Sequence, residues 1–291
     1  MRDTRPTIVA IQGEVGSYHD VAARHYFGGA YRPLCKDTFD EVYEAVEGGK
    51  ANFGLSAVEN SLVGSIPTVY DLLGGKPNIR IIGEIYLGIH HSLLGLPGAS
   101  LQDITDIYSH PVALAQCTSF IKKHLPHAIT HTAADTAGSA IFVKESGNAA
   151  WAAIAGKQNA TRLGISVLAE GVENNPQNYT RFLALARADY APAIPLPSND
   201  KTSLFIAQLS PSDDLAPGTL QRALACFAEQ GIALTKIESR PIGSSPWRYV
   251  FYLDCLAGAE NAHMMAALQQ LTKIGTKWRT LGTYRQGAIV P

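Results

Sequence analysis

The sequence lacks the short patterns that mark several common classes of enzyme. It contains no C-x-x-C pair, no Walker A or G-x-G-x-x-G glycine loop, and no G-x-S-x-G nucleophile motif. These absences argue against a zinc ribbon, a phosphate-binding loop and an ordinary serine hydrolase. His90 and His91 are adjacent, but no pattern of metal ligands accompanies them. We therefore expect no metal ion and no other cofactor.

An excess of one charge and long apolar runs are also missing. The 24 lysines and arginines balance 25 aspartates and glutamates, for a formal net charge of -1. No basic field therefore attracts nucleic acid or a membrane surface. No apolar run approaches the roughly 18 residues of a membrane span, and the first residues contain no apolar run of signal-peptide length. Cys35, Cys117, Cys226 and Cys255 are far apart in the sequence, which is typical of reduced thiols. We expect a cytoplasmic protein with no nucleic-acid or membrane partner.

With 291 residues, the chain is longer than one ordinary core requires and suggests two domains. Short apolar strands, glycine-containing turns and amphipathic helices alternate through residues 8–186, as in the segments TIVAIQG and TFDEVYEAVEGG. This alternation predicts an α/β fold with largely parallel sheets, in which ligands bind at the carboxyl ends of strands. Residues 191–200 include three prolines, which fit neither a helix nor a central strand. We interpret this stretch as a linker.

The residues after the linker predict a separate small domain. Strand patterns at 202–209, 232–241, 247–255 and 277–284 alternate with helical patterns at 217–231 and 261–272. The resulting βαββαβ order is that of a ferredoxin-like fold. In such a fold the helices cover one face of an antiparallel sheet, and the other face or an edge remains available to a partner chain.

Two polar segments that join a strand to a helix are candidates for chemistry. In VENSLVGS, Asn60, Ser61 and Ser65 follow a strand, and we expect Ser65 to cap the next helix, whose free N–H groups favour an anion. In YSHPVALAQC, Ser109 and His110 stand between a strand and a helix. Both patterns are also those of plain capped turns, and on local sequence alone the capping interpretation is favoured.

The third candidate segment is NNPQNYTRFLALA, whose polar half has no carboxylate, histidine or cysteine. Any chemistry there falls to Thr180, whose hydroxyl hardly ionises. Arg181 is able to hold a carboxylate with two hydrogen bonds. In a regular strand it faces away from Thr180 unless both stand at the strand's beginning, and otherwise it is structural. Phe182 shares the face of Thr180 and is interpreted as core packing.

The segments ENSLVGS, SHPVALAQC, NYTRFLALA, PGTL and LTKIESRP follow one another in the order found in prephenate dehydratases. The sequence resembles that family from about Ile8 to Tyr284. The resemblance implies a two-lobed, periplasmic-binding-protein-like catalytic domain over 1–190, with lobes at about 1–78 plus 176–190 and at 79–175. It also implies that 201–291 form a ferredoxin-like ACT regulatory domain and that the protein is a homodimer or homotetramer.

The substrate implied by the resemblance is prephenate, which loses its ring carboxylate and hydroxyl to give phenylpyruvate, carbon dioxide and water. Thr180 is then the hydrogen donor to the departing hydroxyl. Because prephenate carries two carboxylates, positive or N–H partners are expected around it. The residues expected around the substrate are Asn60, Ser61, Ser65, Ser109, His110, Gln116, Asn178 and Arg181.

The implied allosteric ligand is L-phenylalanine, which inhibits such enzymes from the small domain. The residues expected to bind it are Gly218, Thr219, Leu220, Glu238, Ser239, Arg240 and Pro241. Gly218 permits a close backbone approach. The sequence departs from the family's pattern at His19, where serine is usual, and at Thr219 and Gln221, which replace alanine and valine of a Gly-Ala-Leu-Val motif.

Two other functions remain open on the sequence. An arogenate dehydratase performs the same chemistry on the amino-acid analogue of prephenate, and a carboxylate near the substrate's ammonium group would favour it. A non-catalytic amino-acid sensor would bind phenylalanine and convert neither substrate.

Overall fold

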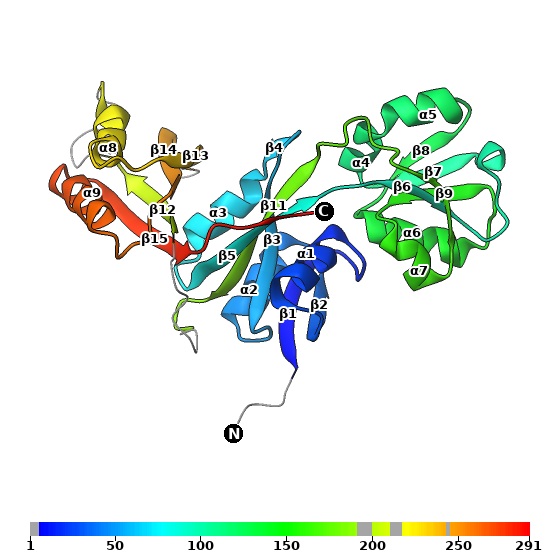
Figure 1. Cartoon of the computed structure of the whole chain (residues 1–291), viewed down its shortest axis with the longest axis horizontal. Coiled ribbons are helices and arrows are strands. Elements are labelled where there is room, and N and C mark those ends of the chain that lie inside the picture. Colours follow the sequence, from blue (N-terminus) through cyan, green and yellow to red (C-terminus); the bar gives the residue numbers. More distant parts are fainter. Residues whose placement is uncertain (1–5, 191–199, 210–216, 243–244) are drawn as a thin grey trace. The chain divides into compact units, whose positions relative to one another are not determined.

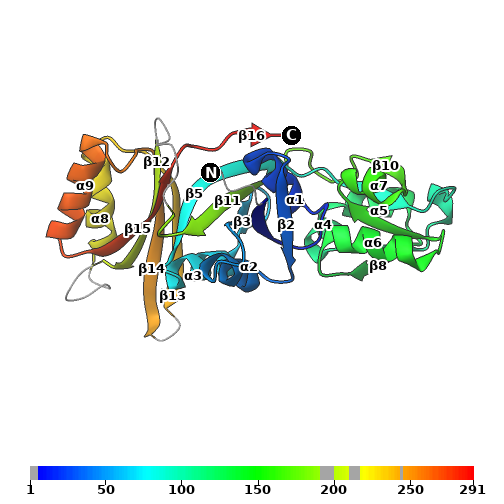
Figure 2. The same cartoon turned by 90° about the horizontal axis from the view of Figure 1, so that it is seen from below.

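The computed structural model describes residues 6–190, 200–209, 217–242 and 245–291, which form three β-sheets with associated helices (Figure 1 and Figure 2). Except for Asp200, the predicted linker lies outside the described residues. Within the described ranges, no helix combines the length and the apolar character needed to cross a membrane.

The first sheet has the strand order β16-β5-β11-β3-β1-β2, and a short strand β4 pairs with β3. Its strands are β1 (Thr7–Gln12), β2 (Tyr31–Lys36), β3 (Phe53–Asn60), β4 (Gly64–Ser65), β5 (Ile79–Gly88), β11 (Tyr179–Arg187) and β16 (Ile289–Val290). The helices that connect its strands are α1 (Tyr18–Phe27), α2 (Phe39–Glu47) and α3 (Pro67–Gly75). β1 runs parallel to β2 and β3, and its central residues 9–11 are fully buried. A continuous apolar run is what a strand covered on both faces requires.

The second sheet has the strand order β10-β6-β9-β7-β8. Its strands are β6 (Ser92–Gly95), β7 (Asp106–Ser109), β8 (Ile129–Thr132), β9 (Trp151–Ala155) and β10 (Ser166–Glu170). A 3-10 helix (Leu101–Asp103) and four α-helices accompany it: α4 (Pro111–Gln116), α5 (Thr118–His124), α6 (Thr136–Ser146) and α7 (Gln158–Leu163). β7 is parallel to β8 and β9, as predicted, whereas β6 is antiparallel to both of its neighbours. β6 follows β5 without a crossover helix, so it is free of the constraint that makes βαβ strands parallel.

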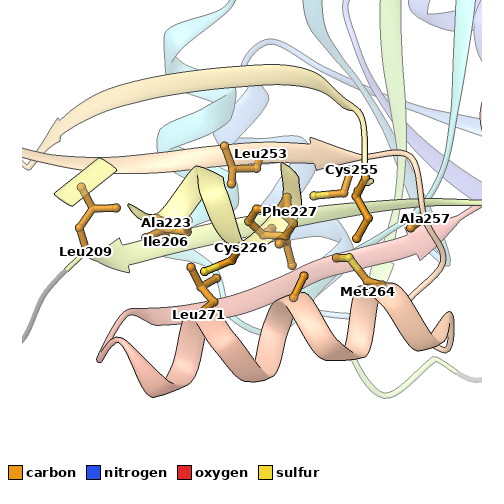
Figure 3. Packing of buried hydrophobic residues seen from close by; sticks show 13 residues of the cluster. Ile206, Leu209, Ala223, Cys226, Phe227, Leu253, Cys255, Ala257, Met264 and Leu271 are labelled. Carbon is orange, nitrogen blue, oxygen red and sulfur yellow. The ribbon is translucent and has the colours of Figure 1, made fainter. Parts of the chain in front are cut away.

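The third sheet confirms the predicted βαββαβ order and has the strand order β13-β14-β12-β15, antiparallel throughout. Its elements are β12 (Lys201–Gln208), α8 (Thr219–Ala228), β13 (Leu234–Ile242), β14 (Ser245–Cys255), α9 (Ala262–Lys273) and β15 (Lys277–Tyr284). Figure 3 shows its core, in which Phe227 of α8 and Met264 and Leu271 of α9 pack with Leu253 of β14. The helices therefore bury one face of this sheet.

By its contacts, the chain divides into two compact units. The first consists of Met1–Ser65, Tyr86–Phe182 and Ile289–Pro291, and the second of Ile66–Ile85 and Leu183–Ala288. The second unit thus contains α3 and most of β5 together with the βαββαβ fold. The first contains the whole second sheet. It also contains the carboxyl end of β3 and the beginning of β11, where the candidate catalytic residues lie. The domain boundaries at 190 and 201 stay a prediction.

Within the second unit, two salt bridges connect the βαββαβ fold with α3 and β5. Lys201 of β12 is 1% exposed, and its Nζ lies 2.9 Å from both carboxylate oxygens of Glu84 on β5. Arg240 of β13 donates two hydrogen bonds, of 2.8 and 2.9 Å, to Asp71 of α3. A buried pair with both carboxylate oxygens engaged costs several kcal/mol if one partner is removed.

Candidate active site

The candidate site lies where the end of β3 meets the beginning of β11, in the first unit. The backbone N–H of Ser61 donates to the carbonyl of Tyr179 at 2.8 Å, and the Ser61 hydroxyl accepts from the Tyr179 N–H at 3.0 Å. This reciprocal pair fixes the beginning of β11. It brings Asn60, the last residue of β3, next to Thr180, the second residue of β11.

Asn60 is held in one orientation by backbone groups. Its Oδ1 accepts hydrogen bonds from the N–H groups of Leu62 and Val63 at 3.0 and 3.1 Å. Because a backbone N–H only donates, the other end of the amide must be Nδ2. Nδ2 lies 3.0 Å from Thr180 Oγ1 and 2.7 Å from Asn178 Oδ1. Thr180 therefore accepts from Asn60, and its own hydrogen is left to be donated elsewhere.

The same network continues to Gln116 at the end of α4. Asn178 is fully buried, and its Nδ2 donates to Gln116 Oε1 at 3.0 Å. Within the part of the chain that the structure describes, Gln116 Nε2 is buried and has no hydrogen-bond partner. A buried unsatisfied donor costs about 1–3 kcal/mol, and an acceptor on a bound ligand would remove this cost.

Beyond Gln116, the network includes residues that the sequence analysis did not select. His91, between β5 and β6, lies with Nε2 3.2 Å from Gln116 Oε1 and with Nδ1 2.8 Å from the Tyr18 hydroxyl. Burial lowers the pKa of His91. The sequence places His90 and His91 next to each other, and no local signal in it indicates a hydrogen bond from His91 to a glutamine on α4.

Ser109 and His110 are engaged by the scaffold. The buried Ser109 hydroxyl donates to the carbonyl of Ile154 on β9 at 2.6 Å. His110 is the N-cap of α4, where its Nδ1 accepts from the Val112 N–H at 3.2 Å, and burial lowers its pKa. The capping alternative for His110 is therefore confirmed. Any contact of these two side chains with a substrate stays a prediction.

The expected helix cap at Ser65 is wrong. α3 begins at Pro67 with Ile66 as its N-cap, and no side chain makes a capping hydrogen bond there. Ser65 instead belongs to β4, where it pairs with Glu59 of β3. Proline at the first helical position explains the difference, because it has no N–H that needs a cap and its φ is already suited to a helix.

Arg181 lies on the side of β11 opposite to Thr180, as strand alternation requires. It is 6% exposed, and its guanidinium carbon lies 6.0 Å from the centre of the Tyr86 ring on β5. These surroundings favour the structural alternative, and substrate binding by Arg181 stays a prediction. Phe182 is 1% exposed, which confirms it as a core residue.

His19, where the resemblance leads one to expect serine, packs against Phe182 of β11. Its ring meets that of Phe182 edge-on with centroids 5.1 Å apart, and its Nε2 accepts from the Ala57 N–H at 3.2 Å. Burial alone lowers the pKa of His19 from 6.5 to about 3. The neutral ring therefore serves as an acceptor inside the core.

The depressed pKa of His19 predicts a loss of stability in acid. Between pH 6.5 and about 3 the unfolded chain binds a proton that the folded chain does not. The free energy of unfolding therefore decreases as the pH is lowered, by up to about 1.4 kcal/mol per pH unit. We expect His19→Gln to show a smaller decrease in unfolding free energy than the parent between about pH 6.5 and about pH 4.5. Urea denaturation at several pH values measures this. His25→Gln, on the exposed side of α1, is the matched control, and an unchanged slope in His19→Gln contradicts the assignment.

The small domain contains a cavity of about 800 Å³ whose lining includes Gly218, Thr219 and Leu220 of the predicted set, with Tyr249 and Phe251 of β14. Gly218, the N-cap of α8, has φ 79°, a left-handed conformation that glycine adopts without strain. The other predicted residues, Glu238, Ser239, Arg240 and Pro241, belong to β13 and are not among those that line the cavity.

The chain is similar to known proteins over nearly all of its length. Residues 9–190 match the family model described as prephenate dehydratase. Over 280 residues the chain is 33% identical to a bifunctional chorismate mutase/prephenate dehydratase of Neisseria gonorrhoeae, with 96% of this chain and 75% of that protein covered. It is 36% identical over 294 residues to arogenate dehydratase 1 of Petunia hybrida, with 95% and 66% covered.

Two solved structures are similar over almost the whole chain. One is a prephenate dehydratase from Arthrobacter aurescens in complex with L-Phe, with a TM-score of 0.85, 30% identity, and coverage of 96% of this chain and 90% of that one. The other is GqqA, described as a novel type of quorum quenching acylase, with a TM-score of 0.84, 32% identity, and coverage of 96% and 98%.

Proposed function

The chain belongs to the prephenate dehydratase family, and we propose that it converts prephenate to phenylpyruvate, carbon dioxide and water with Thr180 as the hydrogen donor. The observation that carries the role of Thr180 is the 3.0 Å contact in which Asn60 Nδ2 donates to Thr180 Oγ1. Electrons released by the ring carboxylate expel the ring hydroxyl as the ring becomes aromatic. Hydroxide is a poor leaving group, and a donor aimed at it stabilises the negative charge that develops there. The leaving hydroxide takes the Thr180 proton to form water, and the threonine oxygen regains a proton from solvent water.

A neutral hydroxyl suits this substrate better than a carboxylic acid. A carboxyl group with an ordinary pKa would already be ionised at neutral pH and would repel a substrate that carries two carboxylates. Because the oxygen of Thr180 already accepts from Asn60, its hydrogen points toward another acceptor. That acceptor is the leaving oxygen in the proposed complex. Gln116 Nε2, the buried donor of the same network, is proposed as a partner of one substrate carboxylate.

Arogenate is the alternative substrate, and the similarity to arogenate dehydratase 1 of Petunia hybrida supports it. The ammonium group of arogenate requires a carboxylate. Turnover of prephenate and arogenate measured on the same protein decides between the two substrates.

The direct test of the proposed function is to mix the purified protein with prephenate, follow the absorbance of phenylpyruvate, and then add phenylalanine. Formation of phenylpyruvate supports the proposal. Conversion of arogenate alone supports the alternative. Binding of phenylalanine without conversion of either substrate indicates a sensor.

We further propose that 201–291 act as an ACT domain that binds L-phenylalanine in the cavity beside α8. Its partly apolar lining, with Leu220 and Phe251 next to the backbone of Gly218, suits an aromatic amino acid. The similar structure from Arthrobacter aurescens was solved with L-Phe. A homodimer or homotetramer is proposed with this domain, and the four free cysteines support a reducing, cytoplasmic location.

Leu220→Asp is expected to weaken phenylalanine inhibition by at least about tenfold, because a buried charge beside an aromatic ring costs more than about 1.4 kcal/mol. Turnover without phenylalanine should remain unchanged. The concentration of phenylalanine that halves the rate is the measurement. Met265→Asp, at an exposed position of α9, is the matched control. Equal inhibition of the two variants would show that phenylalanine binds elsewhere.

A further inference from the structure

We propose that His91 is a positioning residue of the dehydration, which it serves by holding the amide of Gln116 in one orientation. The proposal rests on the function proposed above and on a continuous path of hydrogen bonds. His91 is 2% exposed and lies on the segment that joins β5 to β6. Its two ring nitrogens face Gln116 and Tyr18, at 3.2 and 2.8 Å.

The direction of every hydrogen bond along this path follows from Asn60. Two backbone N–H groups fix Asn60 Oδ1 as an acceptor, so Nδ2 donates to Asn178 Oδ1. Asn178 Nδ2 must then donate to Gln116 Oε1. Since Gln116 Oε1 is an acceptor, the His91 nitrogen that faces it carries a hydrogen. The neutral ring therefore has its proton on Nε2. The Tyr18 hydroxyl, which has one hydrogen, lies 2.8 Å from both Nδ1 of His91 and the carbonyl oxygen of His90.

His91 itself is fixed by two further contacts, and its neighbour His90 makes a third. Its backbone N–H donates to Glu173 Oε2 at 2.9 Å, and its ring meets that of Tyr18 edge-on at a centroid distance of 5.6 Å. The other oxygen of Glu173 lies 3.0 Å from His90 Nδ1. These contacts join the two segments that connect the first sheet with the second, residues 89–91 and 171–178, within the first unit.

The consequence is a Gln116 amide whose oxygen has hydrogen-bond partners and whose nitrogen has none among the described residues. Gln116 Oε1 receives hydrogens from Asn178 and His91, so Nε2 is turned away from both and lies buried with no partner among the described residues. Without His91, only the hydrogen bond from Asn178 Nδ2 opposes rotation of the Gln116 amide by half a turn. Rotation would place the carbonyl oxygen where the substrate carboxylate needs an N–H, and the two would repel each other.

Two substitutions of His91 separate this role from simple packing. His91→Gln keeps a donor near the position of Nε2, whereas His91→Asn reaches only the position of Nδ1 and loses the contact with Gln116. Both replace the ring by a smaller amide. We expect His91→Asn to lower kcat/KM for prephenate by about 10–100-fold, the effect of a lost hydrogen bond to a charged group. We expect His91→Gln to stay within about threefold of the parent.

A double-substitution cycle tests whether His91 acts through Gln116. Gln116→Met removes the amide and keeps the side-chain length. In that background we expect His91→Asn to change kcat/KM by less than about twofold, because the group that it positions is already absent. An equal loss in both backgrounds would overturn the proposal, as would a His91→Asn enzyme as active as the parent.

Nitrogen-15 NMR of the His91 ring gives a readout that depends neither on activity nor on the folding of a variant. The expected spectrum of the full chain has the proton on Nε2 and none on Nδ1. A ring protonated on Nδ1 alone would overturn the proposal even if the protein forms phenylpyruvate. If instead the NMR result is as expected and no phenylpyruvate forms, the His91–Gln116 contact stands and the proposed function is what fails.

Discussion

Replacing Thr180 with valine is expected to lower kcat for prephenate by about 10²–10⁴-fold, the usual contribution of a positioned acid. Valine has the shape of threonine without the hydroxyl, so the packing of β11 above Phe182 remains. The oxygen that accepts from Asn60 Nδ2 at 3.0 Å is lost, and with it the hydrogen for the leaving group. KM should change little, because the contact strengthens mainly as hydroxide departs.

Thr180→Ser is the matched control. It restores the hydroxyl, and we expect it to recover most of the lost rate, to within about tenfold of the parent. Initial rates of phenylpyruvate formation under saturating prephenate measure both variants. If Thr180→Val retains a rate within a few-fold of the parent, Thr180 is not the donor, and another group must protonate the leaving oxygen.

Asn60→Asp is expected to reduce kcat/KM by at least about 10²-fold for two separate reasons. An aspartate still accepts from the N–H groups of Leu62 and Val63, so the turn after β3 should persist. Its second oxygen, however, accepts instead of donating. Thr180 would then donate its hydrogen to residue 60 and no longer to the substrate. The added charge would also repel a substrate dianion, at a cost of about 1–4 kcal/mol for charges about 4 Å apart near a protein surface.

Asn52→Asp is a suitable control for the change of amide to carboxylate. Asn52 Oδ1 accepts from the Ile8 N–H at 2.8 Å, an interaction that aspartate preserves, and it is not part of the network around Thr180. We expect this variant to keep the parent's kcat/KM. Steady-state kinetics at neutral pH compare the two. Equal activity of Asn60→Asp and the parent would refute the donor role of Asn60 and the direction of the whole network.

Local sequence predicted the elements that are decided by short-range rules. α2 begins where Thr38 and Glu41 form a capping box and ends at Gly48. The βαββαβ order follows from strand and helix periodicities separated by turn residues, and the structure confirms it. The local rule failed at Ser65, where Pro67 and the pairing of β4 with β3 decided the beginning of the helix.

The members of the hydrogen-bonded network around Thr180 were predictable in part. Thr180, Asn60, Asn178 and Gln116 were selected on motifs, and the structure brings all four into one hydrogen-bonded network. His91 was missed because its partner Gln116 is 25 residues away in the sequence. Asn60 and Asn178 are 118 residues apart, and no periodicity links such positions.

The sequence by itself determined which residue types are available at the ends of the strands, and it determined the order of strands and helices through patterns that extend over a few residues. Only the tertiary structure decided which polar atoms meet and in which direction each hydrogen bond points. The physical reason is that an amide or a hydroxyl can donate or accept, and its role depends on the neighbours that folding supplies. For Thr180, that neighbour is the amide of Asn60, whose orientation two backbone N–H groups determine.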